Sequence, residues 1–126
     1  MMRPGDRASL TRAYTAADLA AFAALSGAAP GDTVPEPLIG ALFSCLLGTR
    51  LPGPGTGWLK QTLHHHAPAR LLEPLTATVE LTRLRPEKRL ADLACTCLGA
   101  DGRLICTGRA LMLLPPGCVD LHQDVS

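Results

Sequence analysis

The run Pro37-Leu38-Ile39-Gly40-Ala41-Leu42-Phe43-Ser44-Cys45-Leu46-Leu47-Gly48 decides the fold of this chain. It is almost wholly apolar, and its twelve residues are too few to span a bilayer, so it predicts a buried helix. Pro37 suits the first turn, where a missing N–H costs nothing, and Gly48 suits a left-handed helix end. The segments after it alternate like strands. We therefore expect a sheet wrapped around one central helix.

The flanking sequence supplies a second helix and five strands. Thr15, with Asp18 three residues later, predicts a capped helix that Ser26-Gly27 closes, with Leu19, Phe22 and Leu25 on one face. Alternating residues predict an edge strand at 8–14 and further strands at 57–66, 75–84, 90–98 and 103–114. The last two strands form a hairpin around Ala100-Asp101-Gly102, and residues 85–88 form a charged turn.

Composition limits the function. The chain has 126 residues, 47% of them apolar and 18% charged, which indicates one globular domain. We place that domain at residues 1–117 and a polar tail at 118–126. The net charge of +1 and the scarcity of aromatic residues argue against a nucleic-acid or membrane-surface partner.

The cysteines indicate the redox state of the chain. There are five, an odd number, without a C-x-x-C pair, and one of them, Cys45, lies in the central helix. No apolar signal segment is present at the N-terminus. These features favour reduced thiols and a cytoplasmic location.

Three stretches resemble the MaoC-like, (R)-specific enoyl-CoA hydratases. They are residues 14–27, ending Ala21-Phe22-Ala23-Ala24-Leu25-Ser26-Gly27; residues 42–53, with Leu42-Phe43-Ser44-Cys45-Leu46-Leu47-Gly48 and Leu51-Pro52-Gly53; and Trp58-Leu59-Lys60-Gln61 with Pro68 and the strands to Pro115. The resemblance implies an α+β hot-dog fold, an antiparallel sheet around a long central helix. It also implies a dimer that takes acyl thioesters of coenzyme A or an acyl carrier protein, without a cofactor or a metal.

The catalytic segment of that family is missing here. The family places D-x-N-P-x-H after the first helix, where Asp and His activate water, and a backbone N–H at the start of the central helix holds the thioester carbonyl. The nearest match is Asp32-Thr33-Val34-Pro35-Glu36-Pro37, which has Val34 in place of Asn and Pro37 in place of His. No catalytic residue of the family carries over.

The remaining candidate catalytic and substrate-binding residues follow from their residue type and position alone. Asp32 is a candidate base or a turn residue, and Glu36 is a candidate acid or a helix-capping carboxylate. Strand alternation turns His65 toward the central helix. This histidine is a candidate acid–base group in a new position, or a core histidine with a hydrogen-bond partner. Candidate substrate-binding residues are Gln61, on the same strand face as Leu59, Leu63 and His65, and the helix start Leu38, Ile39 and Gly40.

For the other two histidines of this strand and for the cysteines, a structural role is the favoured interpretation. His64 and His66 share the other strand face and have the spacing to bind a metal together, but solvent exposure is the favoured interpretation. Cys95, Cys97 and Cys106 have no adjacent base in the sequence that would activate a thiol for thioesterase chemistry, so we expect them to fill the core.

Three functions fit this sequence. The first is an impaired hydratase or dehydratase subunit that pairs with a homologue carrying the intact motif. The second is an active dehydratase or thioesterase with rearranged residues drawn from Asp32, Glu36 and His65. The third is a module that binds acyl thioesters without turnover.

Overall fold

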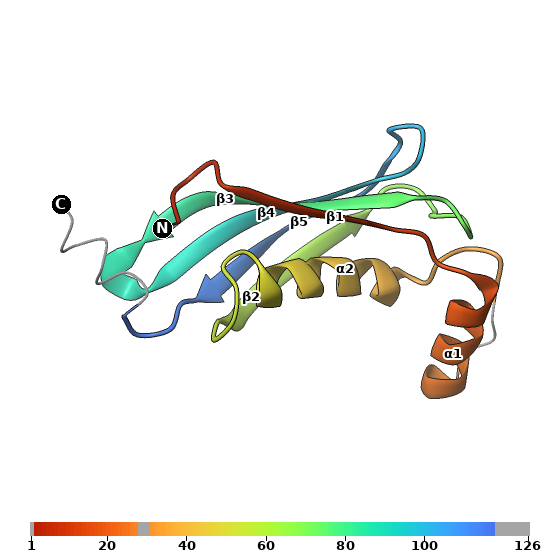
Figure 1. Cartoon of the computed structure of the whole chain (residues 1–126), viewed down its shortest axis with the longest axis horizontal. Coiled ribbons are helices and arrows are strands. Elements are labelled where there is room, and N and C mark those ends of the chain that lie inside the picture. Colours follow the sequence, from red (N-terminus) through yellow and green to blue (C-terminus); the bar gives the residue numbers. More distant parts are fainter. Residues whose placement is uncertain (1, 28–30, 118–126) are drawn as a thin grey trace.

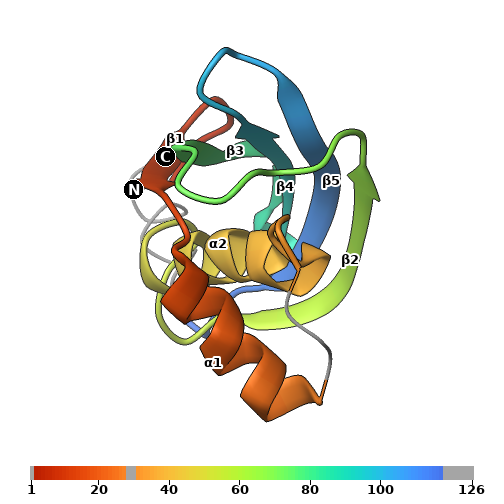
Figure 2. The ribbon, with the colours of Figure 1, turned by 90° about the vertical axis from the view of Figure 1, so that its right-hand side faces the viewer.

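The computed structural model describes residues 2–27 and 31–117. The elements in chain order are β1 (Arg7–Arg12), α1 (Ala16–Ser26), α2 (Glu36–Thr49), β2 (Gly57–His65), β3 (Leu75–Arg85), η1 (Pro86–Lys88), β4 (Leu90–Leu98) and β5 (Leu104–Leu113). The strands form one antiparallel sheet in the order β1-β3-β4-β5-β2. The sheet lies over α2 and curls around it (Figures 1 and 2). This is the predicted hot-dog arrangement; the predicted tail at 118–126 lies outside the described residues.

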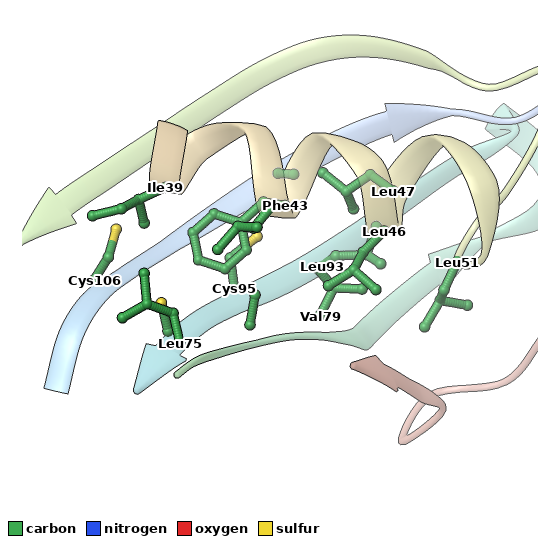
Figure 3. Close-up of a cluster of buried hydrophobic side chains, with 14 of the residues drawn as sticks. Ile39, Phe43, Leu46, Leu47, Leu51, Leu75, Val79, Leu93, Cys95 and Cys106 are labelled. Carbon is green, nitrogen blue, oxygen red and sulfur yellow. The ribbon is translucent and has the colours of Figure 1, made fainter. Parts of the chain in front are cut away.

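The core lies between the inner face of the sheet and one side of α2. Strict alternation in β3 turns Leu75, Ala77, Val79 and Leu81 inward, as predicted, because successive strand residues point to opposite faces. Phe43 is fully buried, and Figure 3 shows its ring between Leu75, Cys95 and the helix. Burial of a side chain of this size contributes about 1.5–3 kcal/mol to folding.

The central helix differs from its prediction in two respects. Pro37 lies in the first turn, as expected, but the helix continues through Gly48 to Thr49, and Arg50 is its C-cap. Gly48 is therefore an ordinary helical residue, and its assignment as a left-handed end was wrong. The helix is also not buried all round, because the sheet covers only one side and leaves Ala41, Cys45 and Gly48 exposed.

The first helix confirms its predicted caps. Thr15 Oγ1 accepts the Asp18 N–H, the Asp18 carboxylate accepts the Thr15 N–H, and Gly27 adopts a left-handed φ of 79°. Leu19 is buried, but Leu25 is 89% exposed, so the face predicted for Leu19, Phe22 and Leu25 is not buried along its whole length. The reason is visible in Figure 2, where α1 projects away from the sheet and α2.

The edge strands also depart from simple alternation. Along β2 a register shift between Trp58 and Lys60 interrupts the pattern, so Leu59 is exposed rather than turned toward the helix. Beyond the shift Leu63 and His65 do turn inward, opposite Gly108 and the buried Cys106. At the other edge β1 ends at Arg12. Tyr14, predicted as its last residue, is buried instead and donates its hydroxyl hydrogen to the Leu38 carbonyl at 2.7 Å.

Candidate active site

A cavity of about 320 Å³ opens beside the first turn of α2. Thr33, Val34, Glu36 and Ile39 form one wall, and residues 65–69, at the end of β2 and just beyond it, form the other. The two walls are tied together because the Val34 N–H donates to the Ala69 carbonyl at 2.8 Å and Thr33 forms a β-bridge with Arg70. These bonds place the start of α2 next to the end of β2.

Three titratable side chains line this cavity, Glu36, His65 and His66, and the first two approach each other. His65 Nδ1 lies 3.9 Å from Glu36 Oε2. The imidazole is 21% exposed and the carboxylate 68%, and Nδ1 itself is buried without a hydrogen-bond partner. A carboxylate next to an imidazole can orient the ring and stabilise its protonated form, which is a general acid–base arrangement.

The helix start offers fewer backbone donors than usual. Pro37 has no N–H, and the Leu38 N–H donates to the Pro35 carbonyl at 3.0 Å. The Glu36 N–H, at the first helical position, has no acceptor within the helix. A thioester carbonyl at this point would therefore meet one N–H and the positive end of the helix dipole.

The other candidate residues lie outside the cavity wall. Asp32 is exposed and does not line it. Gln61 lies on the inner side of β2 opposite Ala110 but is exposed. The Leu38 carbonyl is taken by Tyr14, and a Cβ on Gly40 would lie 3.5 Å from Leu63. The structure thus brings Glu36, Ile39 and His65 together and leaves the other four apart.

The remaining histidines and cysteines have structural surroundings. His64 pairs in register with Thr107 on the outer sheet face, and His66 Nε2 lies 2.7 Å from the Thr107 hydroxyl. Within residues 2–27 and 31–117 no group of three or more metal-binding side chains comes together. Burial raises the pKa of Cys95 to about 12 and that of Cys97 to about 11, and burial followed by the Glu36 charge raises the pKa of Cys106. These thiols stay protonated and are poor nucleophiles at neutral pH.

A larger open hollow, of about 740 Å³, lies at the opposite end of α2. Its arginines are already engaged, since Arg7 pairs with Glu80 at 2.9 Å and Arg50 donates to the Ser9 carbonyl at 2.6 Å. It contains no pair of groups suited to proton transfer. The smaller cavity is therefore the candidate site.

Comparison with known proteins gives the family. An (R)-specific enoyl-CoA hydratase from Aeromonas caviae is 36% identical over 126 residues, which cover 88% of this chain and 94% of that relative. A hydratase of the same description from Rhodospirillum rubrum is 33% identical over 129 residues, covering 90% of this chain and 89% of that relative. The chain belongs to the (R)-specific enoyl-CoA hydratase family. No protein-family model matches it.

The solved structure of an (R)-hydratase from A. caviae superposes with a TM-score of 0.84 at 35% identity, covering 90% of this chain and 98% of that one. A 3-hydroxybutyryl-CoA dehydratase from Methylorubrum extorquens is 46% identical over 74 residues, or 59% of this chain, and this chain spans less than half of it (46%). The alignment with the A. caviae hydratase spans 126 residues, but only 88% of this chain takes part in it. That hydratase therefore has residues for which this chain has no counterpart.

The sequence predicted Glu36, Ile39 and His65 as site residues but not the rest of the cavity wall. Thr33, Val34 and residues 67–69 are small or apolar and carry no titratable side chain. They form a site only because the bonds between residues 33–34 and 69–70 join two distant segments.

None of the helices within residues 2–27 and 31–117 has the length and apolar character that a membrane span requires.

Proposed function

We propose that this chain is a cytoplasmic hydratase or dehydratase of enoyl and 3-hydroxyacyl thioesters, with Glu36 and His65 as its acid–base pair. The observation that carries the proposal is the 3.9 Å approach of the two side chains in a cavity at the start of α2. The family membership supports the reaction class. The free thiols of Cys45, Cys95, Cys97 and Cys106 are consistent with a reducing compartment.

The chemistry follows from the pair. The His65 imidazole removes a proton from water as the water oxygen bonds to C3 of the enoyl thioester. The imidazolium, stabilised by the Glu36 carboxylate, then returns a proton to C2, so water has added across the double bond. The reverse sequence eliminates water from the 3-hydroxyacyl thioester. The Glu36 N–H and the helix dipole would stabilise the negative charge that develops on the thioester oxygen.

The test is hydration of a short trans-2-enoyl-CoA by the purified chain, followed as loss of the conjugated enoyl thioester absorbance. Glu36→Gln and His65→Phe should each lower kcat by about 10²–10⁴-fold, because each removes one member of the acid–base pair. Asp32→Asn is the matched control and should leave kcat unchanged, because Asp32 does not line the cavity. Turnover that survives both site variants would refute the roles of Glu36 and His65.

A second candidate is a subunit that needs a motif-bearing partner. It is favoured by the absence of D-x-N-P-x-H and by the residues of the A. caviae hydratase that have no counterpart here. This candidate predicts no turnover by the chain alone and turnover on addition of a homologue with the intact motif. If neither condition gives turnover, heat stabilisation by an acyl-CoA identifies the non-enzymatic binding module, since a ligand that binds only the folded state raises its stability.

A further inference from the structure

A charge pair with a nearly buried carboxylate lies behind the candidate site. Arg103, just before β5, donates from Nη2 to Glu73 Oε2 at 2.9 Å. Glu73 belongs to the connection between β2 and β3, and its side chain is only 8% exposed. Arg103 also donates from Nη1 to Asp101 at 3.1 Å. The pair therefore joins the β4–β5 turn to the β2–β3 connection, two segments far apart in the sequence.

The carboxylate of Glu73 is satisfied from several sides. It accepts the Arg70 N–H at 2.9 Å and the Ala100 N–H at 3.1 Å in addition to Arg103. Burial by itself would raise the pKa of the Glu73 carboxyl, but the bonds from Arg103, Arg70 and Ala100 outweigh it and hold that pKa below its ordinary value. Gly99 leaves room for this carboxylate, because a Cβ there would collide with Glu73 Oε1. Glu73 is therefore ionised and fixed in place.

The same arginine reaches the wall of the cavity. Its Nη2 donates to the Pro68 carbonyl at 3.0 Å, and Pro68 and Ala69 both line the cavity. The Ala69 carbonyl in turn accepts the Val34 N–H, two residues before Glu36. On the other side His65 lies three residues before Pro68 on the same stretch of chain. Arg103 thus holds the piece of backbone that joins the two members of the acid–base pair.

We propose that Arg103 is a positioning residue for the candidate site, setting the separation of Glu36 and His65 through its bonds to Glu73 and to the Pro68 carbonyl. The Glu73 carboxylate is nearly buried and the Arg103 side chain is 25% exposed, so both lose part of their hydration. Such a pair is weak evidence for stability and is better explained by the geometry it imposes. The planar guanidinium holds Glu73 and Pro68 together, whereas a lysine ammonium is a point charge that cannot reproduce its fork. The kinetic part of the proposal rests on the proposed function; the structural part does not.

The experiment compares Arg103→Lys with Arg85→Lys in the full chain. Arg85 is a matched control, since its bond to Asp92 is also 2.9 Å and its side chain is 24% exposed, against 25% for Arg103. Arg85 lies at the far end of β3 and does not line the cavity. NMR records the His65 ring signal in each variant. The signal is assigned by its absence from the spectrum of His65→Phe. Glu36→Gln shows how the signal responds when the Glu36 carboxylate is removed.

Arg103→Lys should move the His65 ring signal toward its position in Glu36→Gln, and Arg85→Lys should leave it in place. In the hydration assay Arg103→Lys should lower kcat on the order of tenfold to a hundredfold with KM little changed, because the misplaced pair acts on the chemical step. Glu73→Gln, which keeps the shape of the side chain, should give the same two results and serves if Arg103→Lys does not fold.

Equal His65 signals in Arg103→Lys, Arg85→Lys and the unsubstituted chain would overturn the proposal, whatever the stability of the variants. A displaced His65 signal supports the positioning role even if the unsubstituted chain shows no turnover. In that case the proposed function fails and the geometric role of Arg103 stands. Loss of kcat to the same degree in Arg85→Lys would reduce Arg103 to a general stabilising residue and would also overturn the proposal.

Discussion

At the scale of single residues, the carboxylates of Glu36 and Glu73 lie in different surroundings. Glu36 and His65 are partly exposed at the rim of a cavity, where a proton can be exchanged with water or substrate. Glu73 is nearly buried and surrounded by donors, so its charge is committed to structure. The two kinds of carboxylate cannot be distinguished by residue type, and their surroundings decide their roles.

Glu73 predicts a defined dependence of stability on pH. Its folded-state pKa is lowered from an unfolded value near 4.5, so its contribution is fully present above about pH 4.5 and is lost as pH falls through the folded-state pKa. The difference in free energy of unfolding between the unsubstituted chain and Glu73→Gln should therefore be constant near neutrality and shrink below about pH 4.5. Urea unfolding at a series of pH values measures this difference. A gap that stays constant in acid would contradict the role given to this carboxylate.

At the scale of elements, two glycines that look alike in the sequence behave in opposite ways. Gly48 lies inside α2, and a Cβ there would meet nothing within 4 Å. Gly108 lies in β5 where β2 approaches closely, and a Cβ would collide with the Thr62 carbonyl oxygen and press on Leu63. A helical glycine costs conformational entropy, whereas the strand glycine permits β2 to pair and carry His65 to the cavity.

Alanine substitution should separate the two positions. Gly48→Ala should stabilise the fold by about 0.5–1 kcal/mol, because it removes backbone entropy from the unfolded chain without a clash. Gly108→Ala should destabilise by about 1–3 kcal/mol, because β2 must move away from β5. Thermal unfolding of both variants tests this. Destabilisation by Gly48→Ala would argue for the left-handed helix end that the sequence first suggested.

At the scale of the whole molecule, the sheet has an open side. In the described chain β2 is an edge strand that pairs only with β5, and Trp58 and Leu59 are about half exposed at its start. An unpaired edge with exposed apolar side chains favours association with another chain. We therefore expect a dimer that forms through β2, either with a second copy or with a homologous subunit.

Charge at this edge should weaken the dimer. Leu59→Lys should shift the purified chain toward monomer, because it places a charge in the interface. Leu25→Lys is the matched control: this leucine is more exposed still but lies on α1, away from the sheet edge, so the association state should not change. Sedimentation velocity of both variants measures the outcome. A dimer that is unaffected by Leu59→Lys but lost in Leu25→Lys would place the interface on α1.

Most of the architecture was accessible from the sequence because it is encoded locally. The capping box of α1, the alternation of β3 and the turn of the β4–β5 hairpin all depend on residues within a few positions of one another. The departures came where a neighbour overrode the local pattern: the bulge that exposes Leu59, the helix that runs past Gly48, and α1 projecting so that Leu25 is not covered.

The sequence by itself therefore determined the hot-dog fold, the reaction class implied by its family resemblance and the short set of candidate residues. Only the tertiary structure decided that Glu36 and His65 share a cavity, that Asp32 lies outside it, and that Arg103 reaches its wall. The physical reason is one of range. Periodicity and capping report interactions between residues close in the chain, whereas a site depends on distances between segments that only the folded backbone brings together.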